Sequence, residues 1–174
     1  MARIAPRPEH AEVPEETKAA LGRLIASPGV TVALVSGRCA AGAARLGGVD
    51  GVWVIGNHGI ERRDPDGTVD ASDLARPFEN NVAAAARALA PLETSLAGVI
   101  VENKRWTLSV HYRQLESPGL HTLVEEVAFV AAQNGLVVRD GKKVIELRPP
   151  AAVDKGTAAV AFAEGVGALR ESGA

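Results

Sequence analysis

The chain has 174 residues, of which 47% are hydrophobic and 23% are charged, and its net charge at pH 7 is −2. This composition predicts one globular domain or two small ones, and the charge excludes the basic surface that nucleic-acid binding requires. A single cysteine, Cys39, excludes an internal disulfide, and no apolar stretch approaches the ~18 residues of a membrane span, so we expect a cytoplasmic protein that binds neither membranes nor nucleic acids.

The first third of the sequence alternates predicted helices with apolar strands. We expect helices at 14–27 and 39–46, followed by strands at 30–36 and 51–57, respectively. The first strand reads "VTVALVS", a β-branched run typical of a parallel strand that is buried on both faces. This order predicts a doubly wound α/β sheet, in which ligands bind at the carboxyl ends of the strands.

The middle of the chain predicts a different kind of unit. A short hairpin is expected around Asp66-Gly67. Between 76 and 148, a helix followed by two strands occurs twice; the second helix closes at Asn134-Gly135, and the last two strands turn at Asp140-Gly141. This pattern predicts an α+β module inserted into the α/β frame, to which a last helix at about 154–169 returns.

Three short motifs lie where a ligand would be expected. Ser36 and Arg38 follow the first strand in "SGR", His58 follows the second in "GNHG", and Lys155 opens the last helix in "DKG". A hydroxyl, a guanidinium and the free N–H groups of a helix start can all hold a phosphate. An ordinary turn explains each motif singly, so it is their order that indicates a site.

Polar residues also alternate along the strands of the inserted module. On alternating strands, every second side chain shares a face. The residues that this spacing places together are Glu102, Lys104, Thr107, Ser109, His111, Arg113, Glu146 and Arg148. Such a face suits a hydroxyl-rich ligand, and it is equally well explained as a solvated surface with cross-strand ion pairs.

Taken in order, "VALVSGR", "GNHGIE", "VENKRWTLSVHYR", "VIELRPP" and "VDKGTA" resemble the trehalose-6-phosphate phosphatases of the haloacid dehalogenase superfamily. The resemblance implies a Rossmann-like core at 1–73 and 149–174, and an inserted α+β cap of αββαββ order at 74–148. It also implies hydrolysis of trehalose 6-phosphate to trehalose and phosphate, in trehalose biosynthesis, with Mg²⁺ as the family's cofactor.

The resemblance assigns roles to particular residues. Ser36 would bond the transferring phosphoryl group, and Lys155 would offset its negative charge, so both are expected to be catalytic. The resemblance also implies substrate-binding residues of two kinds. Those that match contacts to trehalose hydroxyls are Glu102, Lys104 and Glu146. Those that match polar residues around the substrate are Arg38, His58 and Arg113.

The sequence departs from the family at both ends. The family's nucleophile and acid/base belong to a "DxDGT" motif after the first core strand, and its magnesium ligands belong to a "GDDxTD" motif after a later one. Neither occurs at its place, so we expect an incomplete core without its first and fourth strands, without metal ligands and without turnover. Asp64–Thr68 spells DxDGT, but "GIERR" before it is charged and Pro65 lacks an N–H, so we expect a hairpin turn there.

These departures leave three functions open. The chain could be a trehalose-6-phosphate phosphatase in a truncated form, a non-catalytic module that binds a sugar or sugar phosphate, or a phosphatase acting on another sugar phosphate. Trehalose 6-phosphate or trehalose is the expected partner. The strand at 30–36 would have an open edge, at which we expect self-association.

Overall fold

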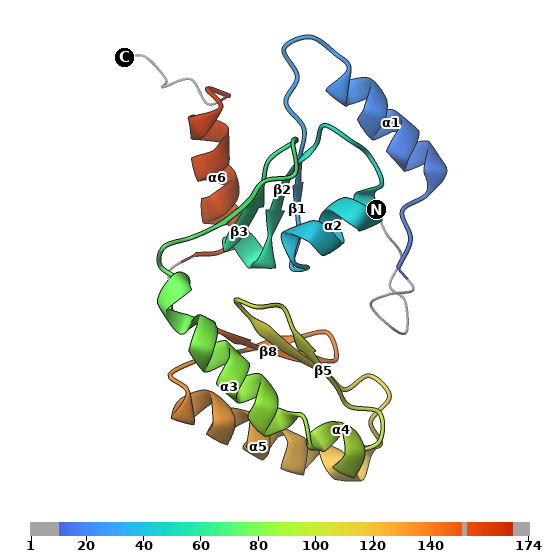
Figure 1. Cartoon of the computed structure of the whole chain (residues 1–174). Coiled ribbons are helices and arrows are strands. Elements are labelled where there is room, and N and C mark those ends of the chain that lie inside the picture. The colour runs from blue at the N-terminus through green and yellow to red at the C-terminus, as the bar shows by residue number, and fades with distance from the viewer. Residues whose placement is uncertain (1–10, 151–152, 169–174) are drawn as a thin grey trace. The chain divides into compact units, whose positions relative to one another are not determined.

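The computed structural model describes residues 11–150 and 153–168. The chain divides into two compact units, each with its own four-stranded sheet (Figure 1). Unit 1 comprises Met1–Ser72 and Val153–Ala174, and unit 2 comprises Asp73–Ala152. Every helix among the described residues is too short or too polar to cross a membrane.

Unit 1 begins with alternating helices and strands, as the apolar pattern predicts. The strand order is β1-β2-β3-β4; β1 and β2 are parallel, and the later pairs are antiparallel. Its elements are α1 (Glu15–Ile25), β1 (Ala33–Val35), α2 (Ala40–Gly47), β2 (Trp53–Gly56), η2 (Asn57–Gly59), β3 (Glu61–Arg63), β4 (Val69–Ala71) and α6 (Lys155–Gly165).

Helices cover both faces of β2. Val54 is fully buried in a cluster with Ala40 and Ala43 of α2. Trp53 points to the opposite face because successive side chains alternate along a strand, and its ring centroid lies 5.4 Å from that of Phe162 in α6. The doubly wound α/β prediction is therefore confirmed around this strand.

The prediction of a long strand at 30–36 buried on both faces is wrong. The strand extends only over Ala33–Val35, and the side chains of Val30 and Val35 are 43% and 41% exposed. The reason is that β1 lies at the end of the strand order, so among the described residues it has a strand neighbour on one side only.

Unit 2 is a four-stranded antiparallel sheet of order β5-β6-β8-β7, with α3 and α5 on one face (Figure 1). Its elements are η3 (Arg76–Phe78), α3 (Glu79–Leu89), α4 (Leu92–Ser95), β5 (Ile100–Asn103), β6 (Leu108–His111), η4 (Ser117–Gly119), α5 (Leu120–Gln133), β7 (Val137–Gly141) and β8 (Val144–Arg148).

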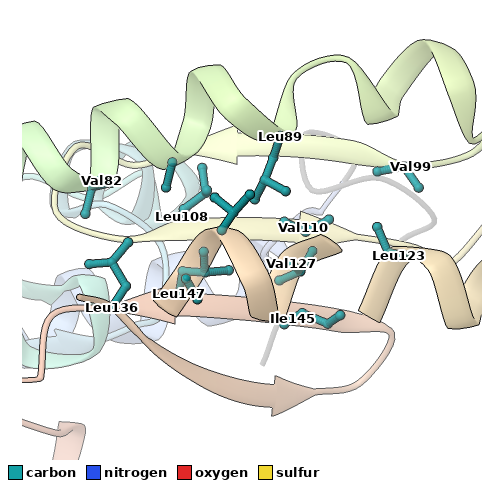
Figure 2. Close-up of a cluster of buried hydrophobic side chains, with 13 residues drawn as sticks. Val82, Leu89, Val99, Leu108, Val110, Leu123, Val127, Leu136, Ile145 and Leu147 are labelled. Atoms are coloured by element: carbon teal, nitrogen blue, oxygen red, sulfur yellow. The ribbon is translucent and has the colours of Figure 1, made fainter. Parts of the chain in front are cut away.

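The sheet and the two helices of unit 2 share one apolar core. Leu108 of β6 and Leu147 of β8 are fully buried, and they pack in one cluster with Leu89 of α3 and Val127 of α5 (Figure 2). Because neighbouring side chains on a strand point to opposite faces, Ser109 lies on the face away from this cluster.

The turn between β7 and β8 differs from the prediction. Gly141 pairs with Val144, so the two-residue loop is Lys142-Lys143 rather than Asp140-Gly141. Asp140 and Gly141 belong to β7, and the left-handed backbone position is taken by Lys143, with φ 63°. An "Asp-Gly" pair favours a turn, but here the pairing of apolar positions along the two strands determines the register.

Native-state hydrogen exchange should find the amides of unit 2 better protected than those of unit 1. Among the residues that the structure describes, the apolar cluster of unit 2 contains thirteen buried residues and that of unit 1 contains four. Opening a segment costs more when it exposes more apolar surface. Slower exchange in β1 and β2 than in β6 and β8 would contradict this expectation.

Candidate functional site

Two turns of unit 1 meet at the carboxyl ends of the parallel strands β1 and β2. They are Ser36–Arg38 and Asn57–Gly59, which we call the paired turns. The His58 amide donates to the Ser36 carbonyl oxygen at 3.0 Å, and the Asn57 amide donates to the Arg38 carbonyl oxygen at 2.7 Å. The Ser36 hydroxyl oxygen accepts from the Arg38 amide at 3.1 Å. The structure thus brings three residues predicted from sequence, Ser36, Arg38 and His58, into one small region.

The paired turns have an unusual backbone. Asn57 and His58 both lie in the left-handed region, with φ values of 46° and 59°. Non-glycine residues in such conformations cost about 1–3 kcal/mol each and occur often at functional sites. A Cβ on Gly37 would lie 2.5 Å from the His58 ring, so only glycine allows the imidazole to pack there.

Helix α6 begins beside the same turns. A Cβ on Gly59 would lie 2.7 Å from the Asp154 carbonyl oxygen and 2.8 Å from the Ala158 Cβ, so the second turn and the start of α6 are in close contact. Lys155, the first residue of α6, is exposed. Lys155, the fourth site residue predicted in unit 1, therefore lies on a helix, α6, that contacts the paired turns.

The N–H groups at the start of α6 are not free, contrary to the expectation from sequence. Asp154 caps the helix: one carboxylate oxygen accepts from the Gly156 amide at 2.7 Å and from the Thr157 amide at 2.9 Å. An anion near this helix start would therefore be held by the Lys155 side chain, because a carboxylate already occupies these backbone donors.

The amide resonances of Gly156 and Thr157 should titrate with Asp154. The hydrogen bonds from Thr157 and then Gly156 lower the pKa of Asp154 from its usual 3.8. Because the pKa of Asp154 is lower in the folded state, the stability that this cap contributes is complete above about pH 3.8. It is lost as the pH falls through the lower, folded-state pKa. NMR from pH 6 to pH 2 should show this in the wild type and a flat response in Asp154→Asn; a midpoint above 3.8 would contradict it.

Arg38 also lines a hollow of about 600 Å³ beside α1 and α2. Two further cations, Lys18 and Arg45, line the same hollow, together with Glu12 and Glu15. Lys18 is paired with Glu15 at 2.6 Å, which offsets part of the positive charge. The hollow is therefore a polar space beside the paired turns, with mixed charge.

The second group of predicted residues lies on the sheet face of unit 2 that points away from the apolar core. The register aligns Glu102 with Ser109, Ser109 with Glu146, and Glu146 with Arg139 in one row across the sheet. Residues directly opposite on antiparallel strands have Cβ atoms about 4.5–5.5 Å apart. We call this surface the polar face and define it by Glu102, Lys104, Ser109, His111, Glu146 and Arg148.

Neighbouring side chains contact both carboxylates of the polar face. One Glu102 oxygen lies 2.9 Å from His111 Nε2 and 4.0 Å from Lys104 Nζ. The Arg148 guanidinium donates from Nε to Glu146 at 2.9 Å, with a second contact from Nη2. The charges largely cancel while the hydrogen-bonding groups remain, so the polar face suits a neutral, hydroxyl-rich ligand better than an ion.

The hydroxyl of Ser109 is buried at the centre of the row. Ser109 is 1% exposed, and its Oγ has no hydrogen-bond partner. Leaving a buried polar group unpaired costs about 1–3 kcal/mol, and such groups are rare in native structures. Ser109 is thus the most unusual polar group of unit 2.

Arg113 lies apart from the polar face. Strand β6 ends at His111, and Arg113 is an exposed residue of the following turn. Its Nη2 donates to the Lys142 carbonyl oxygen at 3.1 Å. The structure therefore groups Glu102, Lys104 and Glu146 and leaves Arg113 outside.

The DxDGT spelling at Asp64–Thr68 is a hairpin turn, as predicted. It joins β3 to β4, the Gly67 amide donates to the Asp64 carbonyl oxygen at 3.0 Å, and Asp66 accepts from the Thr68 amide at 2.9 Å. Among residues 11–150 and 153–168, no group of three His, Cys, Asp or Glu side chains could hold a metal ion.

The chain is similar to a known protein family, to curated proteins and to solved structures. The family model for trehalose-phosphatase matches residues 1–168. An uncharacterised glycosyl hydrolase of Mycobacterium tuberculosis is 38% identical over 155 residues, which cover 89% of this chain and 12% of that protein. A trehalose-phosphate phosphatase of Mycobacterium avium is 36% identical over 153 residues, covering 88% of this chain and 39% of the relative. The chain thus spans less than half the length of these relatives.

A solved structure shares the fold. The crystal structure of a trehalose-6-phosphate phosphatase related protein superposes with a TM-score of 0.84 at 19% identity, covering 94% of this chain and 69% of that one. Its sequence identity is low, so this likeness concerns the fold alone.

Proposed function

The chain belongs to the trehalose-phosphatase family of the haloacid dehalogenase superfamily, and we propose that it recognises trehalose 6-phosphate through two separate groups of residues. In unit 1, the paired turns and Lys155 bind the phosphoryl group. In unit 2, the polar face binds the sugar hydroxyls. Unit 1 is then the catalytic core of the family, and unit 2 is its cap.

One observation carries the proposal: Glu102, Lys104 and Glu146, which match sugar contacts in the family, lie on one face of one sheet. Glu102 and Glu146 both flank Ser109 in the register, and Lys104 lies 4.0 Å from Glu102. A disaccharide offers many hydroxyl groups and no charge. The polar face offers matching acceptors and donors with little net charge, which supports the sugar as its ligand.

The residues of unit 1 match the other end of the substrate. The Ser36 hydroxyl can donate to a phosphoryl oxygen, and the Arg38 and Lys155 side chains can offset negative charge. His58 would position the Ser36–Arg38 turn, since its ring packs on Gly37 and its amide bonds the Ser36 carbonyl.

Hydrolysis also needs a nucleophile and a metal ion. The sequence contains no aspartate before Asp50, so none precedes Ser36. The family's phosphatases generally depend on Mg²⁺, but the described residues contain no cluster that fits the ion. We therefore propose that these 174 residues bind the substrate without turning it over.

We also propose that the chain associates with itself and that it is located in the cytoplasm. Among the described residues, β1 has a strand neighbour on one side only, and the side chain of Val35 on it is exposed. An unpaired apolar edge favours pairing with another strand, which supports self-association. The single cysteine is in keeping with a cytoplasmic location.

Calorimetric titration of the chain with trehalose 6-phosphate, trehalose and inorganic phosphate tests the proposal. We expect trehalose 6-phosphate to bind most tightly. Lys155→Met should lower the affinity for trehalose 6-phosphate by at least about tenfold, because a charge-assisted hydrogen bond is lost. The affinity for trehalose should not change. Lys142→Met, an exposed lysine of the β7–β8 loop, is the matched control.

Equal affinity of the wild-type chain for trehalose and its phosphate would contradict the role of unit 1. Phosphate release at ordinary enzymatic rates, ~1–1000 per second, would contradict the proposed lack of turnover.

A further inference from the structure

We propose that Ser109 is a sugar-binding residue whose hydroxyl contacts a single ligand hydroxyl group between Glu102 and Glu146. This inference rests on the proposed function and deepens it, because it assigns the centre of the polar face. The family resemblance points to Glu102, Lys104 and Glu146, and it assigns nothing to Ser109.

The register places the Ser109 hydroxyl between two acceptors. Glu102 is its direct neighbour on β5, and Glu146 is its direct neighbour on β8. A serine hydroxyl beside two carboxylates would ordinarily donate to one of them. Ser109 Oγ instead has no partner, although the residue is 1% exposed.

The neighbours of Ser109 are already engaged with other groups. Glu102 is held by His111 at 2.9 Å, and Glu146 is held by Arg148. These contacts orient both carboxylates, and the buried Ser109 hydroxyl remains unpaired. A ligand hydroxyl would reach it once the side chains that cover it move aside. A ligand hydroxyl also has one donor and two acceptor positions, so it can pair with Ser109 and a flanking carboxylate together.

This arrangement also explains why a neutral polyol would be preferred. An anionic ligand group at Ser109 would lie between two carboxylates and would be repelled by both. A cationic group would compete with Lys104, His111 and Arg148 for the same oxygens. A neutral hydroxyl avoids both costs.

Ser109→Ala tests the inference. We expect trehalose affinity, measured by calorimetry, to fall about tenfold, the effect of one buried hydrogen bond. The melting temperature should stay the same or rise, because the substitution removes a polar atom that is unpaired without the ligand. The matched control is Ser95→Ala, whose hydroxyl bonds the Pro91 carbonyl at 3.2 Å away from the polar face, and it should bind as the wild type does.

A set of trehalose analogues, each lacking one hydroxyl group, identifies the contact itself. One analogue should bind the wild type and Ser109→Ala with equal affinity, because the partner of Ser109 is already gone; the others should still separate the two proteins. If the role of Ser109 is purely structural, Ser109→Ala should change the affinities for all analogues by the same factor.

The outcomes separate this inference from the proposed function. If trehalose binding is weakened by Glu102→Gln and unchanged by Ser109→Ala, the inference is wrong and the proposed function stands. A lower melting temperature of Ser109→Ala with unchanged affinity would mean that the hydroxyl holds a structural water, which also overturns it. If the wild type binds neither trehalose nor its phosphate, the proposed function fails and the inference fails with it.

Discussion

Glu102→Gln should lower the affinity of the chain for trehalose about 10- to 100-fold. Glutamine keeps the shape of the side chain and removes its charge, and hydrogen bonds to charged groups are worth about 1.5–3 kcal/mol. The loss should be large because Glu102 also organises the polar face: it is the common partner of His111 at 2.9 Å and of Lys104 at 4.0 Å.

Glu125→Gln is the matched control for this prediction. Glu125 lies on α5, its side chain is 65% exposed, and its contact is with His121 on the same helix. It should change neither trehalose affinity nor the melting temperature. If Glu102→Gln and the wild type are both folded and bind trehalose with equal affinity, the polar face does not bind the sugar.

Leu108→Ala should lower the free energy of unfolding of unit 2 by about 2–5 kcal/mol, the usual cost of a buried leucine-to-alanine change. Leu108 is fully buried in the cluster shared by β6, β8, α3 and α5 (Figure 2). Its neighbour Ser109 faces the other side of the sheet, so the truncation should also loosen the strand that carries the centre of the polar face.

Leu74→Ala, the same chemical change at a side chain that is 58% exposed, is the control. Surface substitutions usually change stability by less than about 0.5 kcal/mol. Urea unfolding followed by circular dichroism measures both variants. Similar midpoints for Leu108→Ala and Leu74→Ala would mean that the cluster does not stabilise unit 2.

Much of the fold could be predicted from local patterns because they reflect local physics. The alternation of Leu108 and Val110 with polar neighbours identifies β6, and Gly135 ends α5 with a φ of 62°. The β-branched run at 30–36 was overextended because a run of apolar residues does not reveal whether neighbouring strands exist on both sides.

The polar face could be predicted only in part. Strand parity placed Ser109 and His111 beside Glu102, but parity says nothing of which groups find a partner, so the unpaired Ser109 hydroxyl emerges only from the structure. The position of Arg139 in the row beside Glu146 was not predicted, for a different reason. A loop at Asp140-Gly141 would pair Arg139 with Lys142, whereas the observed loop pairs it with Glu146.

Helix starts show a similar limit. The "DKG" motif indicates where α6 begins, and the helix does begin at Lys155. The same motif does not reveal that Asp154 accepts from the backbone amides that could otherwise bind a phosphate. Which of several acceptors occupies a donor depends on the local backbone conformation, and this is not encoded in residue type alone.

The most direct test is an NMR titration of the isotopically labelled chain with trehalose 6-phosphate. We expect the amide shifts to change most at Ser36, Gly37 and Lys155 in unit 1 and at Glu102, Ser109 and Glu146 in unit 2. Trehalose alone should move only the second group. No shift changes, or changes confined to Lys18, Gly42 and Arg45 of the hollow, would contradict the claim that this chain recognises a phosphorylated disaccharide.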